Sequence, residues 1–114
     1  MITIEKLNSF GANTVEGLAR CLGNEGLYLK LVATIPSEAT FDRLKSALNK
    51  QDLENAFLAA HALKGVLGNL SLTPLYKSIA EITELLRKRT EMDYSGKLSE
   101  ILSQKEKLAR LCNE

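Results

Sequence analysis

Residues 53–70, LENAFLAAHALKGVLGNL, form the stretch of sequence that decides the fold. When these residues are placed around a helix at about 100° per residue, the small and apolar side chains gather on one side. The single histidine of the chain, His61, falls on the opposite side. We therefore expect this helix to bury one stripe and to expose His61. The residues of the expected buried stripe are Ala56, Ala59, Ala60, Leu63, Val66, Leu67 and Leu70.

Two glycines lie on the same side of this helix as His61. Gly65 and Gly68 stand inside the expected helix, where each glycine costs about 1 kcal/mol relative to alanine. Close crossing of two helices also uses small residues, but it would place them on the buried stripe. We therefore expect both glycines to leave open space beside the imidazole.

The side chains around His61 suit a histidine that accepts an anionic group. An exposed imidazole is largely neutral in the cytoplasm and keeps a lone pair on one ring nitrogen for attack on an electrophile. Lys64, one turn further along, supplies a cation for the product. Phe57 and Leu58 fit either a docking patch for a partner or a boundary contact with a neighbouring helix. The pattern predicts reversible phosphorylation of His61.

Apolar residues recur at intervals of three and four throughout the chain, so we predict an all-helical protein. Asn13 has the capping-box spacing at one helix start, and Asp52 caps the central helix. Pro36 breaks one helix, and we expect Ser37 to cap the next. The pair Thr73–Pro74 is typical of a cap followed by proline at the first helical position. Short connections favour an antiparallel bundle. The expected helices cover residues 4–10, 14–22 with a stop at Gly23, 24–35, 38–49, 53–70, 74–89, and a last one that begins near Asp93 or Tyr94 and runs to residue 111.

Length and composition exclude several classes of protein. A chain of 114 residues predicts one domain, residues 1–114. A formal net charge of +1 argues against nucleic acid as a partner, and the one dense basic cluster, Arg87–Arg89, stands where a helix ends and opposes its dipole. One histidine and two separated cysteines cannot form a zinc site. Because the apolar runs are too short for a bilayer and no signal peptide is evident, we expect a cytoplasmic protein without a membrane partner.

The segment Ala60–Leu70, AHALKGVLGNL, resembles the signature helix of histidine-containing phosphotransfer (HPt) domains. The pattern of that family is His-x-Leu-Lys-Gly, followed by a small residue three positions after the glycine. The resemblance extends over most of the chain, with a short N-terminal helical region and two long helices after the signature. It implies an antiparallel four-helix bundle of the HPt type with short additional N-terminal helices.

The resemblance also implies a role for individual residues. His61 would be the phosphoacceptor, Lys64 would stabilise the phosphoryl oxygens, and Gly65 and Gly68 would provide clearance. Ser71 stands where relatives commonly have glycine. The residues expected to dock a partner are Glu54, Phe57, Leu58 and Asn69, and those expected to orient the ring, in place of the usual Glu or Gln, are Thr83 and Glu84.

These roles predict a phosphocarrier in a two-component phosphorelay rather than a self-sufficient kinase. His61 would accept a phosphoryl group from the aspartate of one receiver domain and pass it to another. The expected partners are response-regulator receiver domains and a hybrid histidine kinase. We expect a monomer that binds no cofactor, with magnesium on the receiver. A phosphoacceptor domain of a larger histidine kinase and a helical adaptor without transfer activity remain as alternatives.

Overall fold

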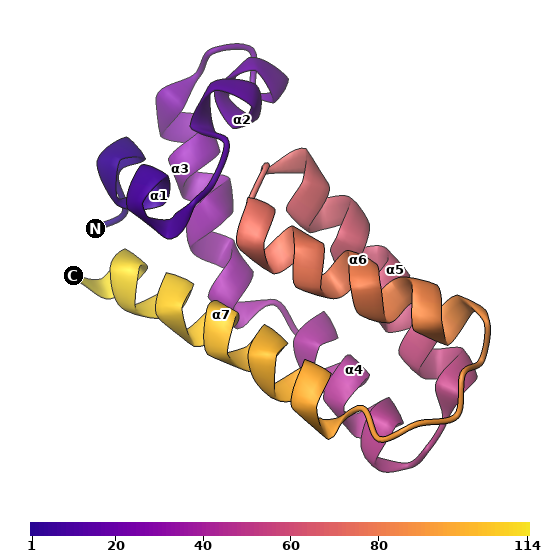
Figure 1. The fold of residues 1–114 in the computed structure, drawn as a ribbon. Coiled ribbons are helices and arrows are strands. Elements are labelled where there is room, and N and C mark those ends of the chain that lie inside the picture. Colours follow the sequence, from indigo (N-terminus) through magenta and orange to yellow (C-terminus); the bar gives the residue numbers. More distant parts are fainter.

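The computed structural model describes residues 1–114, and every regular element in it is a helix (Figure 1). The all-helical prediction is therefore confirmed. The elements are α1 (Ile4–Phe10), α2 (Thr14–Arg20), α3 (Glu25–Thr34), the 3-10 turn η1 (Ile35–Ser37), α4 (Thr40–Asn49), α5 (Leu53–Asn69), α6 (Thr73–Arg87) and α7 (Ser95–Asn113).

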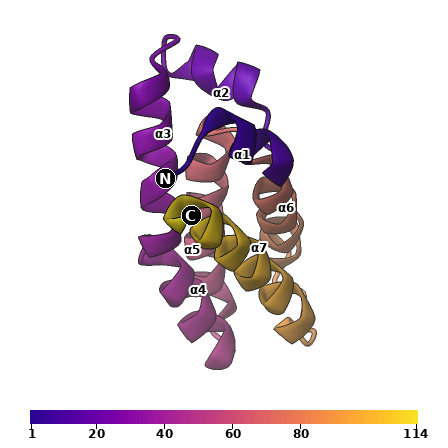
Figure 2. The same ribbon diagram turned by 90° about the vertical axis from the view of Figure 1, so that its left-hand side faces the viewer.

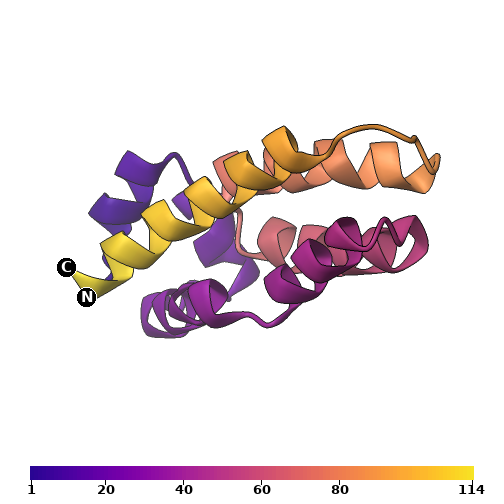
Figure 3. The same ribbon diagram turned by 90° about the horizontal axis from the view of Figure 1, so that it is seen from below.

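The last four helices form an antiparallel bundle. Short turns join α4 to α5 and α5 to α6, so consecutive helices run side by side in opposite directions (Figure 1, Figure 3). α5 packs against both α4 and α6, and α7 packs against α6. α1, α2 and α3 gather at one end of the bundle (Figure 2). The predicted four-helix bundle with short additional N-terminal helices is confirmed.

The two ends of the chain meet at one point of the surface (Figure 1, Figure 2). The amino group of Met1 donates a hydrogen bond to the backbone carbonyl of Glu114. The Lys6 ammonium joins them, since it donates to the carbonyl of Glu114 at 3.0 Å and to that of Met1 at 2.8 Å.

Two predicted side-chain caps are confirmed. Asn13 Oδ1 accepts the backbone N–H of Glu16 at 3.1 Å, and Asp52 Oδ1 accepts that of Asn55 at 3.1 Å. The Asn55 side chain also donates to Asp52 at 2.6 Å. This side-chain bond, followed by the backbone bond, lowers the pKa of the Asp52 carboxyl. Both caps satisfy N–H groups that the first helical turn leaves without a partner.

Two other predicted helix starts are wrong in detail. α4 begins at Thr40 rather than at residue 38, because Ser37 closes the 3-10 turn that follows Pro36. The carboxylate of Glu38 accepts the Thr40 backbone N–H at 3.3 Å in place of a Ser37 cap. In α6, the N-cap position holds an apolar residue without a side-chain cap, and Pro74 is the second helical residue. Proline is tolerated there because its missing N–H has no partner in the first turn.

Four helices end through left-handed backbone at a residue that is not glycine. After α5, the N–H of Ser71 donates to the carbonyl of Gly68 at 3.1 Å, and the N–H of Leu72 donates to that of Leu67 at 3.2 Å. This pair of bonds is typical of the Schellman motif. Left-handed backbone costs roughly 1–2 kcal/mol in a residue with a Cβ atom. The four residues are Leu22, Gln51, Ser71 and Arg89, with φ between 53° and 57°.

The left-handed residues shorten two of the predicted helices. α2 ends at Arg20, earlier than the predicted stop at Gly23 implies, and α6 ends at Arg87 instead of Arg89, because the left-handed position follows the last turn almost directly. The last helix also begins slightly later than predicted, at Ser95, whose backbone N–H donates to the Asp93 carboxylate at 2.9 Å.

Tyr28 fastens the N-terminal helices to the bundle. Its side chain is completely buried, and its hydroxyl donates to the backbone carbonyl of Leu70 at 2.9 Å. Burial raises the pKa of Tyr28 to about 12, so the hydroxyl remains a donor at neutral pH. Gly17 of α2 approaches the same ring so closely that a Cβ atom there would lie 2.5 Å from Tyr28 Cζ. This approach requires glycine and fixes α2 against α3.

Ser71→Gly is expected to raise the free energy of unfolding by about 1 kcal/mol. Glycine adopts the left-handed backbone without steric cost, and the replacement removes a buried hydroxyl that has no hydrogen-bond partner. Urea denaturation followed by circular dichroism measures the change. Ser71→Ala is the matched control, because it removes the hydroxyl and keeps the strained backbone. A Ser71→Gly protein no more stable than Ser71→Ala would show that the backbone carries no strain.

Candidate functional site

α5 has one buried face and one exposed face, as its sequence predicts. Val66 is the exception, because it lies at the edge of the predicted stripe and stays 39% exposed where the neighbouring helices do not cover it. Its assignment to the core is therefore wrong. The other members of the predicted stripe are buried: Ala56, Ala59, Ala60, Leu63, Leu67 and Leu70.

The His61 imidazole lies on the exposed face of α5 with an aromatic ring one turn before it. The Phe57 ring stacks on it, with 5.7 Å between ring centroids and 23° between ring planes. Residues four apart on a helix are surface neighbours, which brings the two rings together. The Phe57 ring also contacts two guanidinium groups, with Arg87 Cζ 5.0 Å and Arg89 Cζ 5.1 Å from its centroid. The sequence allowed Phe57 to be either a docking residue or a boundary contact with a neighbouring helix. Its position over the end of α6 fits the boundary contact.

The basic cluster Arg87–Arg89 stands at the end of α6, as predicted. The guanidinium of Arg89 donates to the backbone carbonyl of Leu86 at 2.7 Å, and that of Arg87 donates to the Glu84 carboxylate at 3.3 Å. Cations at this end of a helix oppose its negative dipole end. The cluster is thus held by its own helix and by the Phe57 ring.

A polar cleft of about 680 Å³ opens beside His61. It brings together five of the predicted site residues, all of them on α5. His61 and Lys64 lie on its wall together with Gly65, Gly68 and Asn69. The cleft therefore offers a nitrogen nucleophile and a cation to the same small volume.

Gly65 and Gly68 differ in their surroundings. A Cβ atom at Gly65 would meet no other atom within 4 Å, so the expected open space is present there. A Cβ atom at Gly68 would lie 3.1 Å from Cε1 of Tyr76. The expectation of open space is wrong at Gly68, because the tyrosine ring of α6 occupies it. The small size of Gly68 serves the close approach of α5 and α6.

Neither predicted ring-orienting residue is joined to His61. Thr83 is completely buried on the inner face of α6, and its hydroxyl donates to the backbone carbonyl of Ile79 at 2.6 Å. Glu84 is exposed and accepts from Arg87. No hydrogen bond links either side chain to the imidazole, whose stacking partner is Phe57.

Three of the four residues expected to dock a partner, Glu54, Phe57 and Leu58, do not line the cleft. Leu58 is 57% exposed and lines a separate groove between α4 and α5. Glu54 is exposed in the first turn of α5. The structure therefore separates Leu58 and Glu54 from the cleft that contains His61 and Asn69.

Seven lining residues of the cleft are not predicted as site residues from the sequence, and two of them, Ser71 and Thr73, stand at the α5–α6 turn. Tyr76 and Lys77 come from α6, while Asn13, Glu16 and Arg20 come from α2 and the residue before it. The capping pattern at Asn13 indicated a helix start, but no local signal places that helix beside His61. Only the packing of α2 against the end of the bundle brings these side chains to the cleft.

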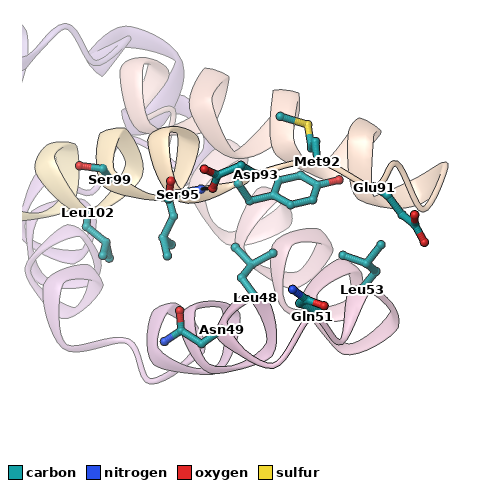
Figure 4. Close-up of a pocket in the computed structure, with 12 residues that line it drawn as sticks. Leu48, Asn49, Gln51, Leu53, Glu91, Met92, Asp93, Ser95, Ser99 and Leu102 are labelled. Atoms are coloured by element: carbon teal, nitrogen blue, oxygen red, sulfur yellow. Dashed lines mark hydrogen bonds between the residues drawn. The ribbon is translucent and has the colours of Figure 1, made fainter.

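A larger groove of about 910 Å³ lies between the α4–α5 turn and the start of α7 (Figure 4). The side chains of Leu48, Leu53 and Leu102 point into it, and Glu91 and Asp93 stand at its edge. No histidine, lysine or arginine lines this groove. It therefore does not suit an anionic group, and the cleft beside His61 is the candidate site.

No cluster of three or more His, Cys, Asp or Glu side chains could hold a metal ion. None of the helices combines the length and apolar character needed to span a membrane. Fold and site together define a helical bundle that displays a single imidazole on an exposed helix face beside a lysine.

The family model described as Hpt domain matches residues 36–114, so the chain belongs to the Hpt domain family. Members of this family carry out histidine phosphotransfer in phosphorelays and interact with receiver domains and kinases. The resemblance in the signature helix is therefore confirmed at the level of the family. Comparison with curated proteins and with solved structures gives no match.

Gly65→Ala is expected to raise the free energy of unfolding by about 0.5–1 kcal/mol, because alanine is the better helix former and its Cβ meets no atom. Gly68→Ala provides the contrast. Its Cβ would press on Tyr76, so we expect no gain or a loss of stability. Thermal and urea unfolding measure both variants. Equal gains for the two would show that Gly68 is as unconfined as Gly65.

Proposed function

We propose that this chain is a phosphorelay intermediate in which His61 accepts a phosphoryl group from the aspartate of one receiver domain and passes it to another. The observation that carries the proposal is the exposed imidazole in a polar cleft beside Lys64, with open space at Gly65. A tetrahedral phosphoryl group needs such clearance next to the nitrogen that bears it.

The transfer step follows from the chemistry of imidazole. The lone pair of one ring nitrogen of His61 attacks the phosphorus of the aspartyl phosphate. The P–N bond forms as the P–O bond to the aspartate breaks, and the electron pair of that bond stays on the carboxylate oxygen. The other ring nitrogen then releases its proton to water. Donation to the next receiver reverses these steps.

Each neighbour of His61 has a proposed part in this step. Phe57 orients the imidazole by stacking, and Arg87 and Arg89 hold the Phe57 ring in place. The Thr83 hydroxyl donates to the backbone carbonyl of Ile79 and not to the imidazole. The stacking contact therefore supports Phe57 as the residue that orients the ring. Lys64 attracts the phosphoryl oxygens, a contribution of about 1 kcal/mol at a partly exposed site.

The chain acts as a carrier in this proposal. It brings the nucleophile and its clearance, and the receiver brings the magnesium ion and the activated phosphate, so the chain itself binds no cofactor. We propose a cytoplasmic monomer in which residues 1–114 form one domain. A single core cluster that extends from Ile2 to Leu108 supports the domain assignment. Leu58 and Glu54, exposed outside the cleft, are proposed as peripheral docking contacts.

Incubation with phosphoramidate, a small phosphoryl donor, tests whether His61 is the acceptor. We expect intact mass to increase by one phosphoryl group, and the label to be lost in acid and kept in alkali, because protonation of the ring makes imidazole a leaving group. His61→Gln is expected to take up no label. Label on both proteins would place the acceptor elsewhere, and label on neither would favour an adaptor without transfer activity.

Lys64→Ala is expected to slow transfer between the chain and a receiver by about fivefold, because the variant loses an electrostatic stabilisation of about 1 kcal/mol. Rapid-quench measurement of the phosphohistidine gives the rate. Lys45→Ala, which removes an exposed lysine of α4 outside the cleft, is the matched control. If the two variants transfer at the same rate, Lys64 has no part in the step.

A further inference from the structure

The segment that precedes the family match builds one wall of the cleft. The match covers residues 36–114, whereas Asn13, Glu16 and Arg20 line the cleft beside His61. These three side chains come from α2 and its cap, at the end of the bundle where α5 turns into α6 (Figure 1). The cleft is therefore incomplete without the N-terminal helices.

Three contacts hold this wall in a fixed position. The backbone N–H of Asn13 donates to the carbonyl of Ser71 in the α5–α6 turn at 2.9 Å. Gly17 lies directly against the buried ring of Tyr28, and the hydroxyl of that ring donates to the carbonyl of Leu70 at 2.9 Å. α2 is thus anchored to the end of α5, only a few turns beyond His61.

The charges around the cleft have an uneven distribution. Glu16 and Arg20 form an ion pair at 3.1 Å, so the α2 wall is close to neutral. Lys64 on α5 and Lys77 on α6 also line the cleft, and neither takes part in an ion pair. The rest of the cleft is therefore positive, and it suits an anionic surface as its occupant.

We propose that α2 is part of the docking surface for receiver domains and that its Glu16–Arg20 pair selects among receivers by charge. This inference rests on the proposed function. A receiver that holds magnesium does so with carboxylates, so acidic side chains stand around the aspartate that accepts the phosphoryl group. When these side chains approach Lys64 and Lys77, the α2 wall lies beside them. Arg20 attracts acidic side chains of the receiver, and Glu16 repels them.

The two members of the pair predict effects of opposite sign. Arg20→Gln leaves the Glu16 carboxylate uncompensated and makes the wall negative. Glu16→Gln keeps an oxygen that can accept from Asn13 and leaves Arg20 uncompensated, so the wall becomes positive. Charges at the rim of an interface change mainly the association rate and its dependence on salt. A purely structural role of α2 would make both variants worse.

The test uses the full chain, loaded with phosphoramidate to the same extent in every variant, and receiver domains encoded in the same genome. Loss of the phosphoryl group from the chain is followed at low ionic strength and at sub-saturating receiver. We expect Arg20→Gln to slow the loss by about threefold and Glu16→Gln to accelerate it by a similar factor, with both effects shrinking as salt is added.

Two exposed residues outside the cleft provide matched controls. Lys30→Gln on α3 removes one positive charge, and Glu106→Gln on α7 removes one negative charge. The inference is overturned if Arg20→Gln and Glu16→Gln change the rate in the same direction or do not differ from these controls. If the loaded wild-type chain passes its phosphoryl group to no receiver, the proposed function is contradicted, and the inference fails with it.

Discussion

The rest of the structure depends on the burial of one face of α5. Ala56, Ala59 and Ala60 are small and buried where α5 packs against α4 and α6, and Leu63 and Leu67 continue the same buried face. Burial of apolar surface contributes about 25 cal/mol per Å². This contribution fixes the rotation of α5 about its own axis. Because the rotation is fixed, the opposite face of the helix, with its imidazole, is held toward solvent.

Features that arise within one helix could be predicted from the sequence. The caps at Asn13 and Asp52 depend on residues three positions apart, and the exposure of His61 depends on the period of a single helix. The ends of several helices were predicted less well. Their left-handed positions are held by residues such as Ser71 and Arg89, which carry no glycine signal. Their conformation follows from the closing hydrogen bonds and not from local preference.

The candidate site shows the same division between local and long-range effects. His61, Lys64 and Gly65 lie on one exposed helix face, so their proximity follows from spacing alone. The space at Gly68 is decided by Tyr76 of another helix, and the ring of Phe57 is held by arginines from the end of α6. Contacts of this kind depend on how helices cross, which the residue pattern within one helix does not reveal. The α2 wall of the cleft belongs to this second group.

The meeting of the chain ends has a topological consequence. Because the Lys6 ammonium donates to the carbonyls of both Met1 and Glu114, residues 1 and 114 lie side by side and the path of the backbone between them is nearly a closed ring. A short linker between the ends would therefore add little strain, and the connection between α6 and α7 would be a natural place for new termini. In such a circular permutant, α7 would lead directly into α1. Moving the termini would change the order of the helices along the chain but not the way in which they pack.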